Sequence, residues 1–171
     1  GRAATISFVP ACSARFPVER FNFSAAFDQA VGANGRDRVL VLASNGHSDT
    51  SLGGGTKLSR LSHRGVVGVL TDGRLRDFEQ LVDYPFTAWC RGETTRWGGG
   101  DVVPFQADIP VVVDQVLIMP GDLIYADSSG AVVIPADESD AVASLAREIA
   151  VEESKACGEI EADERARRSP T

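Results

Sequence analysis

The sequence is poor in the residues on which several common classes of protein depend. Among its 171 residues are three cysteines, Cys12, Cys90 and Cys157, which are widely spaced and form no CxxC pair. This odd, dispersed set indicates reduced thiols in a cytoplasmic protein, because a disulfide framework or a structural zinc site needs paired cysteines. No apolar run approaches the roughly 20 residues of a membrane span, so no membrane association is expected. No signal peptide precedes Gly1, although the chain begins almost at once in a strand, which is compatible with a missing N-terminal segment.

Positive charge is also scarce. The sequence has 17 Lys and Arg residues, only two of them lysines, against 24 Asp and Glu residues. Its net charge is therefore −7 at pH 7 and its pI is near 4.8. A sequence-independent nucleic-acid binder needs a basic face, so no nucleic-acid partner is expected. The glycine motifs GxGxxG and GxxxxGKS/T of nucleotide-binding proteins are missing as well. A small anionic substrate remains compatible with this negative net charge, since the local electrostatic field of a site can oppose the net charge.

Short apolar runs separated by turn residues predict a single α/β domain over residues 1–158 and a charged tail over residues 159–171. Strands are predicted over residues 4–9, 38–43, 66–70, 86–90, 102–105, 109–113, 116–119, 122–126 and 131–134. Helices are predicted over residues 22–31, around Leu58 and Leu61 as far as Gly65, over 78–82, and from Asp137 toward Gly158. Hairpin-like spacing in the second half favours a layered sheet over a doubly wound one.

The stretch from Ser51 to Asp77 holds the candidate site. Three glycines, 53 to 55, precede Thr56, Lys57 and a short helix, and a buried strand then leads to Arg76 and Asp77. A glycine-rich loop that enters a helix presents unpaired N–H groups to an anion. Arg76 adds a fixed cation and Asp77 a hard oxygen ligand. The hypothesis is that these groups hold a small carboxylate substrate against a divalent metal. The alternative is that Arg76 and Asp77 form a structural ion pair, that the three glycines only permit tight packing, and that Lys57 is a surface lysine.

Two segments carry a family resemblance. GVVGVLTDGRLRD (65–77) and VLIMPGDLIYADSSGAVVIP (116–135) resemble the RraA-like family. That family includes metal-dependent 4-hydroxy-4-methyl-2-oxoglutarate / 4-carboxy-4-hydroxy-2-oxoadipate aldolases and regulators of ribonuclease activity. The resemblance implies a β/β/α swivelling-type layered sheet domain that assembles as a homotrimer or hexamer, with the Arg76–Asp77 cleft at the subunit boundary.

The resemblance also implies roles for individual residues. Asp77 would ligate Mg²⁺ or Mn²⁺, and Arg76 would hold the oxo acid and stabilise its enolate. Backbone amides near Gly54, Gly55 and Thr56 would receive the substrate carboxylate. The family's aldolases carry an acid that orients metal-bound waters twenty-one positions before the arginine, and here Gly55 occupies that position. Lys57 is a candidate to supply charge in its place.

Two classes of function follow from the resemblance. The first is a metal-dependent lyase that cleaves a 4-hydroxy-2-oxo diacid or decarboxylates oxaloacetate through a pyruvate-type enolate. The second is a non-catalytic regulator that binds a protein partner. The Arg76–Asp77 pair favours the enzyme, whereas Gly55 favours the regulator or a family member with a different substrate.

Overall fold

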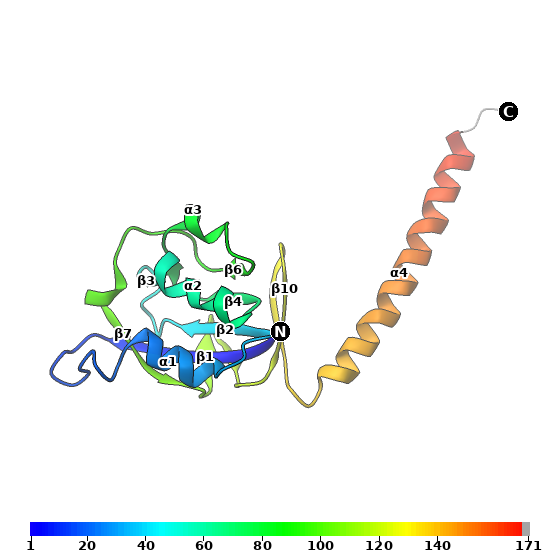
Figure 1. The fold of residues 1–171 in the computed structure, drawn as a ribbon. Coiled ribbons are helices and arrows are strands. Elements are labelled where there is room, and N and C mark those ends of the chain that lie inside the picture. The colour runs from blue at the N-terminus through cyan, green and yellow to red at the C-terminus, as the bar shows by residue number, and fades with distance from the viewer. Residues whose placement is uncertain (169–171) are drawn as a thin grey trace. The chain divides into compact units, whose positions relative to one another are not determined.

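Four parallel strands form the centre of the computed structural model, which describes residues 1–168 (Figure 1). They lie side by side in the order β1 (Arg2–Pro10), β2 (Arg38–Ala43), β4 (Gly68–Thr71) and β6 (Thr87–Trp89). The other edge of β1 pairs in antiparallel fashion with two later strands, β7 (Val102–Ala107) and β10 (Leu123–Asp127). A last strand, β11 (Gly130–Ile134), pairs with β10 and completes a seven-stranded mixed sheet.

Two layers cover this sheet, one on each face. The helices α1 (Phe23–Val31) and α2 (Gly55–Arg64) pack on one face, and the hairpin of β8 (Val111–Val113) and β9 (Val116–Ile118) packs on the other. Strand β2 serves both layers, because successive side chains of a strand point to opposite faces. Leu40 and Leu42 contribute to the helix-side core, and Val39 and Val41 to the hairpin-side core. This α, β, β layering confirms the predicted α/β swivelling-type fold.

A side-chain hydrogen bond links β6, at one end of the strand order, to β10, the second strand from the other end. The indole Nε1 of Trp89, in β6, donates to the backbone oxygen of Asp127 in β10 at 3.0 Å. The nearby ion pair between Arg91 and Asp114 ties the segment after β6 to the turn of the β8–β9 hairpin. The sheet is therefore nearly closed, although β6 and β10 share no strand ladder.

Four short elements complete the first compact unit, which spans residues 1–133. They are β3 (Ser51–Gly53), β5 (Arg74–Leu75), α3 (Phe78–Leu81) and the 3₁₀ turn η1 (Gly98–Gly100). The sequence predicted the turn of helix at α3 but a loop where β3 lies, and it did not predict β5. Strands of two or three residues show no alternation from which they could be recognised.

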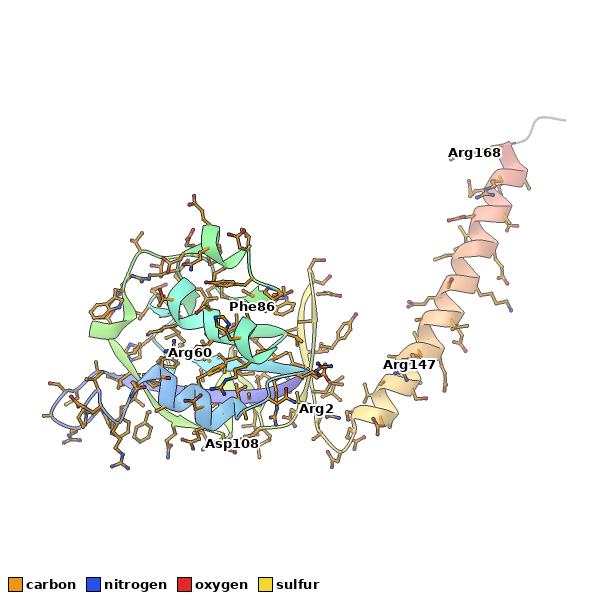
Figure 2. All side chains as sticks on the ribbon, in the orientation of Figure 1. Arg2, Arg60, Phe86, Asp108, Arg147 and Arg168 are labelled. Atoms are coloured by element: carbon orange, nitrogen blue, oxygen red, sulfur yellow. The ribbon has the colours of Figure 1, made fainter. Side chains whose placement is uncertain are left out.

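Residues 134–171 form the second compact unit, in which α4 (Ser139–Arg168) is the one regular helix of the described part. The helix runs through Gly158, so residues 159–168, expected as part of a charged tail, are helical; residues 169–171 lie outside the described residues. Its side chains, Arg147 among them, project outward along its length (Figure 2). The single domain predicted over 1–158 stays a prediction. None of the helices within residues 1–168 has an apolar stretch able to cross a bilayer.

Candidate active site

The two-strand ladder of β3 and β5 brings the glycine loop beside Arg76 and Asp77. Ser51 lies opposite Arg74, Gly53 lies opposite Leu75, and the Arg76 N–H donates to the Gly53 oxygen at 3.0 Å. Both loops follow the carboxyl ends of the parallel strands β2 and β4, where α/β sheets commonly place ligand sites. The predicted glycine loop and the predicted Arg-Asp pair are therefore neighbours.

Asp77 joins these two loops through its side chain. Its Oδ2 accepts a hydrogen bond at 2.9 Å from the N–H of Gly55, the first residue of α2. The residue before α2 is Gly54, which has no side chain to cap the helix, so the Asp77 carboxylate takes that role from another element. Asp77 itself adopts the left-handed conformation, with φ 63°, which Asp and Asn tolerate better than most residues.

Gly54 has to be a glycine for this contact to form. A Cβ at Gly54 would stand 2.5 Å from the Asp77 Oδ2 and 3.2 Å from the Arg76 Cβ. Those distances are shorter than van der Waals contact, so any larger residue would separate the two loops. Packing alone therefore requires a glycine at position 54.

A cavity of about 250 Å³ lies between these loops. Its walls are Ser51, Gly53, Gly54, Thr56, Lys57, Arg76, Asp77, Trp97 and Gly98. Five of the six predicted site residues thus border one cavity, and the exception is Gly55. The Arg76 guanidinium has no hydrogen bond or ion pair with any residue among 1–168, so its charge is available to a ligand.

Lys57 is the second cation of the cavity, and its surroundings disfavour its charge. Burial lowers the pKa of the Lys57 amine, and the positive charges of Arg76 and Arg60 lower it further. Arg60 lies one turn further along α2 (Figure 2). The Lys57 Nζ also stands 5.6 Å from the centroid of the Phe23 ring. An anion in the cavity would relieve the repulsion between Lys57 and Arg76, which favours a negatively charged ligand.

Gln80 fills the space that a side chain at position 55 would occupy. Its Oε1 overlaps the position that a Cβ at Gly55 would take, and its Nε2 donates to the Tyr84 hydroxyl at 2.7 Å. That hydroxyl in turn donates to the Gly55 oxygen at 3.3 Å. The sequence analysis missed Gln80 and Tyr84, because their approach to Gly55 depends on how α3 packs on α2 and no local pattern encodes it.

Trp97 forms a wall of the cavity on a loop that polar contacts hold in place. The Asp101 carboxylate accepts from Arg96 Nε at 2.6 Å and from the Thr50 hydroxyl at 3.0 Å. These hydrogen bonds and the charge of Arg96 lower the pKa of Asp101. The Trp97 side chain nevertheless remains 63% exposed, so its ring can adjust to a ligand.

The protein ligands available to a divalent metal are few. Asp77 is the one carboxylate among the described residues that borders the cavity, and its Oδ2 already accepts a hydrogen bond from Gly55 N–H. Glu79 and Glu93 border a neighbouring cavity of about 310 Å³ that Arg76 and Asp77 also line. Residues 1–168 contain no group of three His, Cys, Asp or Glu side chains arranged for a metal. The donor set thus fits an ion held by one carboxylate oxygen with water and substrate as its other ligands, as Mg²⁺ accepts.

A family model described as RraA-like (Aldolase/RraA) matches residues 1–133. The chain belongs to the RraA-like family. The matched residues contain the whole cavity between the glycine loop and Arg76–Asp77, and they coincide with the first compact unit.

The chain is similar to several individual proteins at modest identity. The chain is 29% identical over 142 residues to Protein DlpA of Legionella pneumophila, covering 80% of this chain and 21% of DlpA. It is 30% identical over 120 residues to the 4-hydroxy-4-methyl-2-oxoglutarate aldolase of Thermus thermophilus, covering 67% of this chain and 70% of that protein. Among solved structures, Streptomyces coelicolor RraAS2, an unusual member of the RNase ES inhibitor RraA protein family, has a TM-score of 0.80 at 26% identity. That match covers 93% of this chain and 77% of RraAS2. The matched part of the chain spans about a fifth of the length of DlpA. It spans about half the length of another relative, the putative 4-hydroxy-4-methyl-2-oxoglutarate aldolase of Halalkalibacterium halodurans.

The capping contact of Asp77 leads to a prediction about stability. Asp77→Asn should keep nearly all of the free energy of unfolding, because an amide oxygen can accept from Gly55 N–H and Asn tolerates the left-handed conformation. Asp77→Gly should lose about 1 kcal/mol with the cap alone. Asp77→Ala should lose about 1–3 kcal/mol, since it adds the backbone strain. Urea unfolding of the three variants measures this, and a glycine variant as stable as the parent protein would rule out the capping role.

Proposed function

We propose that the chain is a metal-dependent lyase that cleaves or decarboxylates a small 2-oxo acid and releases a pyruvate-type enolate. The observation that carries this proposal is the cavity that Arg76, Lys57 and the start of α2 line beside Asp77, with an Arg76 guanidinium that has no ion pair among residues 1–168. Membership of a family with relatives named as 4-hydroxy-4-methyl-2-oxoglutarate aldolases supports it.

The chain's own residues supply the binding of the oxo acid. The planar guanidinium of Arg76 matches the paired oxygens of a 2-oxo carboxylate, and the first N–H groups of α2, at Thr56 and Lys57, have no partner within the helix. When the bond between C3 and C4 of the substrate breaks, its electron pair passes through C3 to the oxygen at C2, and the C2–C3 unit becomes an enolate. C4 leaves as CO2 from oxaloacetate, or as the carbonyl carbon of a second oxo acid from a 4-hydroxy-2-oxo diacid, whose hydroxyl proton passes to water. Arg76 stabilises that charge, and Lys57 adds a second positive charge to the same cavity. A proton then returns to C3 and gives pyruvate.

The proposed cofactor is Mg²⁺ or Mn²⁺. Asp77 would hold the ion through the carboxylate oxygen that Gly55 N–H leaves free. When bound, such an ion acts as a Lewis acid toward the developing enolate oxygen.

Arg76 gives the direct test of this chemistry. Arg76→Ala should lower turnover by about 100–1,000-fold, the usual cost of removing a preorganised partner of a developing oxyanion. Arg76→Lys should fail nearly as badly, because an ammonium cannot present a planar fork to the oxo-carboxylate pair. The assay is pyruvate release from oxaloacetate and from 4-hydroxy-4-methyl-2-oxoglutarate, with and without chelator.

Arg60 provides the matched control, since it lies on the same helix as Lys57 but does not border the cavity. Arg60→Ala should retain turnover. Lys57→Ala distinguishes two versions of the mechanism: a small loss leaves Arg76 and the metal as the main stabilisers, and abolition assigns that role to the lysine. If the folded parent protein, supplied with metal, released pyruvate from neither substrate, the result would contradict the proposal.

The resemblance places an acid at position 55, where this chain has Gly55 with Gln80 packed against it. This difference leads to a prediction about metal affinity. Gly55→Asp alone has to displace Gln80, whereas Gly55→Asp with Gln80→Ala leaves room for the new carboxylate. The double variant should bind Mg²⁺ or Mn²⁺ about 10–100-fold more tightly, since groups that orient metal-bound waters commonly contribute that much. Isothermal calorimetry measures it, with Gln80→Ala alone as the control. An unchanged affinity in the double variant would exclude Asp77 as part of a metal site of this type.

The second candidate function is a non-catalytic regulator that binds a protein partner. Gly55 in the position of the acid favours it, and so does the similarity to RraAS2 of the RNase ES inhibitor RraA protein family. A parent protein that releases no pyruvate from either substrate, so that none of its variants can lose activity, would favour this candidate.

The assembly we propose is a homotrimer or a hexamer built from trimers, with the Arg76–Asp77 cavity at the subunit boundary. The β8–β9 hairpin exposes Val112, Val116 and Leu117 at 51%, 47% and 58%, and exposed apolar residues that form a contiguous patch mark interaction surfaces. Light scattering should give at least three times the 18.2 kDa mass of one chain. A single 18.2 kDa species in dilute buffer would contradict this.

A further inference from the structure

A second and larger cavity adjoins the one described above. Its volume is about 550 Å³, and Lys57 and Trp97 line both cavities. The remaining walls come from the segment before α1, from the start of α1 and from β7. For scale, an apolar cavity of roughly 150 Å³ suffices to hold a benzene ring.

Aromatic and aliphatic side chains dominate these walls. Phe23, Val102 and Pro104 are buried at the base, and Phe16, Phe21 and Val103 are half-buried around them. Phe16 and Phe21 meet edge to face with ring centroids 5.2 Å apart, which fixes the orientation of both rings. Besides Lys57, Glu19 is the one charged side chain among the lining residues of the described chain.

Lys57 marks the boundary between the charged and the apolar cavity. Its Nζ stands 5.6 Å from the centroid of the Phe23 ring, and its charge interacts with that of Arg76 in the first cavity. A ligand whose anionic head lies between Lys57 and Arg76 can therefore place an uncharged group past Trp97, among Phe16, Phe21 and Phe23. A second carboxylate in that position would lie among the apolar rings and face Glu19. The Arg20 guanidinium, 5.3 Å from the centroid of the Phe21 ring, is not among the residues that line the cavity.

We infer that the preferred ligand is a 2-oxo acid with an aryl or arylalkyl substituent, whose head binds in the Arg76 cavity and whose ring binds in the Phe16–Phe21–Phe23 cavity. This inference rests on the proposed function for the head group and extends it to the rest of the ligand. It differs from the small polar diacids of the proposed lyase reaction in having an apolar tail.

Two acids with the same head test the inference by calorimetry. The probes are 2-oxobutanoate and 4-phenyl-2-oxobutanoate, which differ by the ring alone. On the parent protein the phenyl compound should bind about 10–100-fold more tightly, as burial of one aromatic ring permits. Arg76→Ala should weaken the binding of both acids, because both share the head. Equal affinities on the parent protein would overturn the inference.

Variants of the apolar wall locate the ring. Phe16→Ala should reduce the preference for the phenyl compound by about tenfold and leave 2-oxobutanoate unchanged. Phe105→Ala is the matched control: Phe105 meets Phe16 edge to face, with ring centroids 5.4 Å apart, but does not line the cavity, so the preference should persist. Val103→Trp, which fills the cavity from β7, should abolish the preference independently of Phe16.

The two proposals fail separately in these experiments. A preference that survives both Phe16→Ala and Val103→Trp places the ring elsewhere and overturns the inference. Pyruvate release from oxaloacetate without any preference for the phenyl compound sustains the lyase and rejects the apolar subsite. A preference that both wall variants remove, in a protein that releases no pyruvate, sustains the subsite and rejects the lyase.

Discussion

The hydrogen bond from Gly55 N–H to the Asp77 carboxylate is the contact on which the geometry of the site depends. It joins the first residue of α2 to the residue that precedes α3, and it lies beside the short β3–β5 ladder and the hydrogen bond from the Tyr84 hydroxyl to the Gly55 oxygen. Because Gly54 offers no side chain, the start of α2 has its cap from Asp77 alone among the described residues. The same carboxylate is thus a structural cap and the candidate metal ligand, and one oxygen is left for each task.

Much of the fold could be predicted from the sequence because its strands are apolar on both faces and its turns carry glycine, proline and aspartate. The strand over residues 38–43 has the bounds that the apolar run predicts, and α1 begins after Asn22, whose side chain caps it. The helix α4 extended ten residues beyond the expected end at Gly158 because a charged sequence without an apolar face does not by itself end a helix. Its acidic and basic residues at i, i+3 and i+4 instead pair along the helix, as Lys155 and Glu159 do.

The candidate site was predictable in its backbone and its charges but not in its apolar part. Arg76, Asp77 and the glycine loop belong to one stretch of sequence, residues 51–77. They meet in space because a pair of parallel strands brings together the loops at its carboxyl ends. Gln80, Trp97 and Phe23 come from segments that no local pattern connects to the motif. Their positions follow from the packing of α3, of the loop held by Asp101 and of α1 against α2.

The electrostatics of the cavity explain how a chain of net charge −7 can favour an anion. Long-range repulsion from surface carboxylates is screened within about 10 Å at ordinary ionic strength, whereas Lys57 and Arg76 act at contact distance. Burial removes water from Lys57 and lowers its pKa, so an anion that arrives replaces lost hydration and repels neither group. Phe23 beneath the amine has the opposite effect on a charged tail, because its ring offers no hydrogen bond. In the ligand we infer, the two sides of Lys57 would therefore receive different groups: the carboxylate end would lie toward Arg76, and the uncharged end toward the phenylalanines.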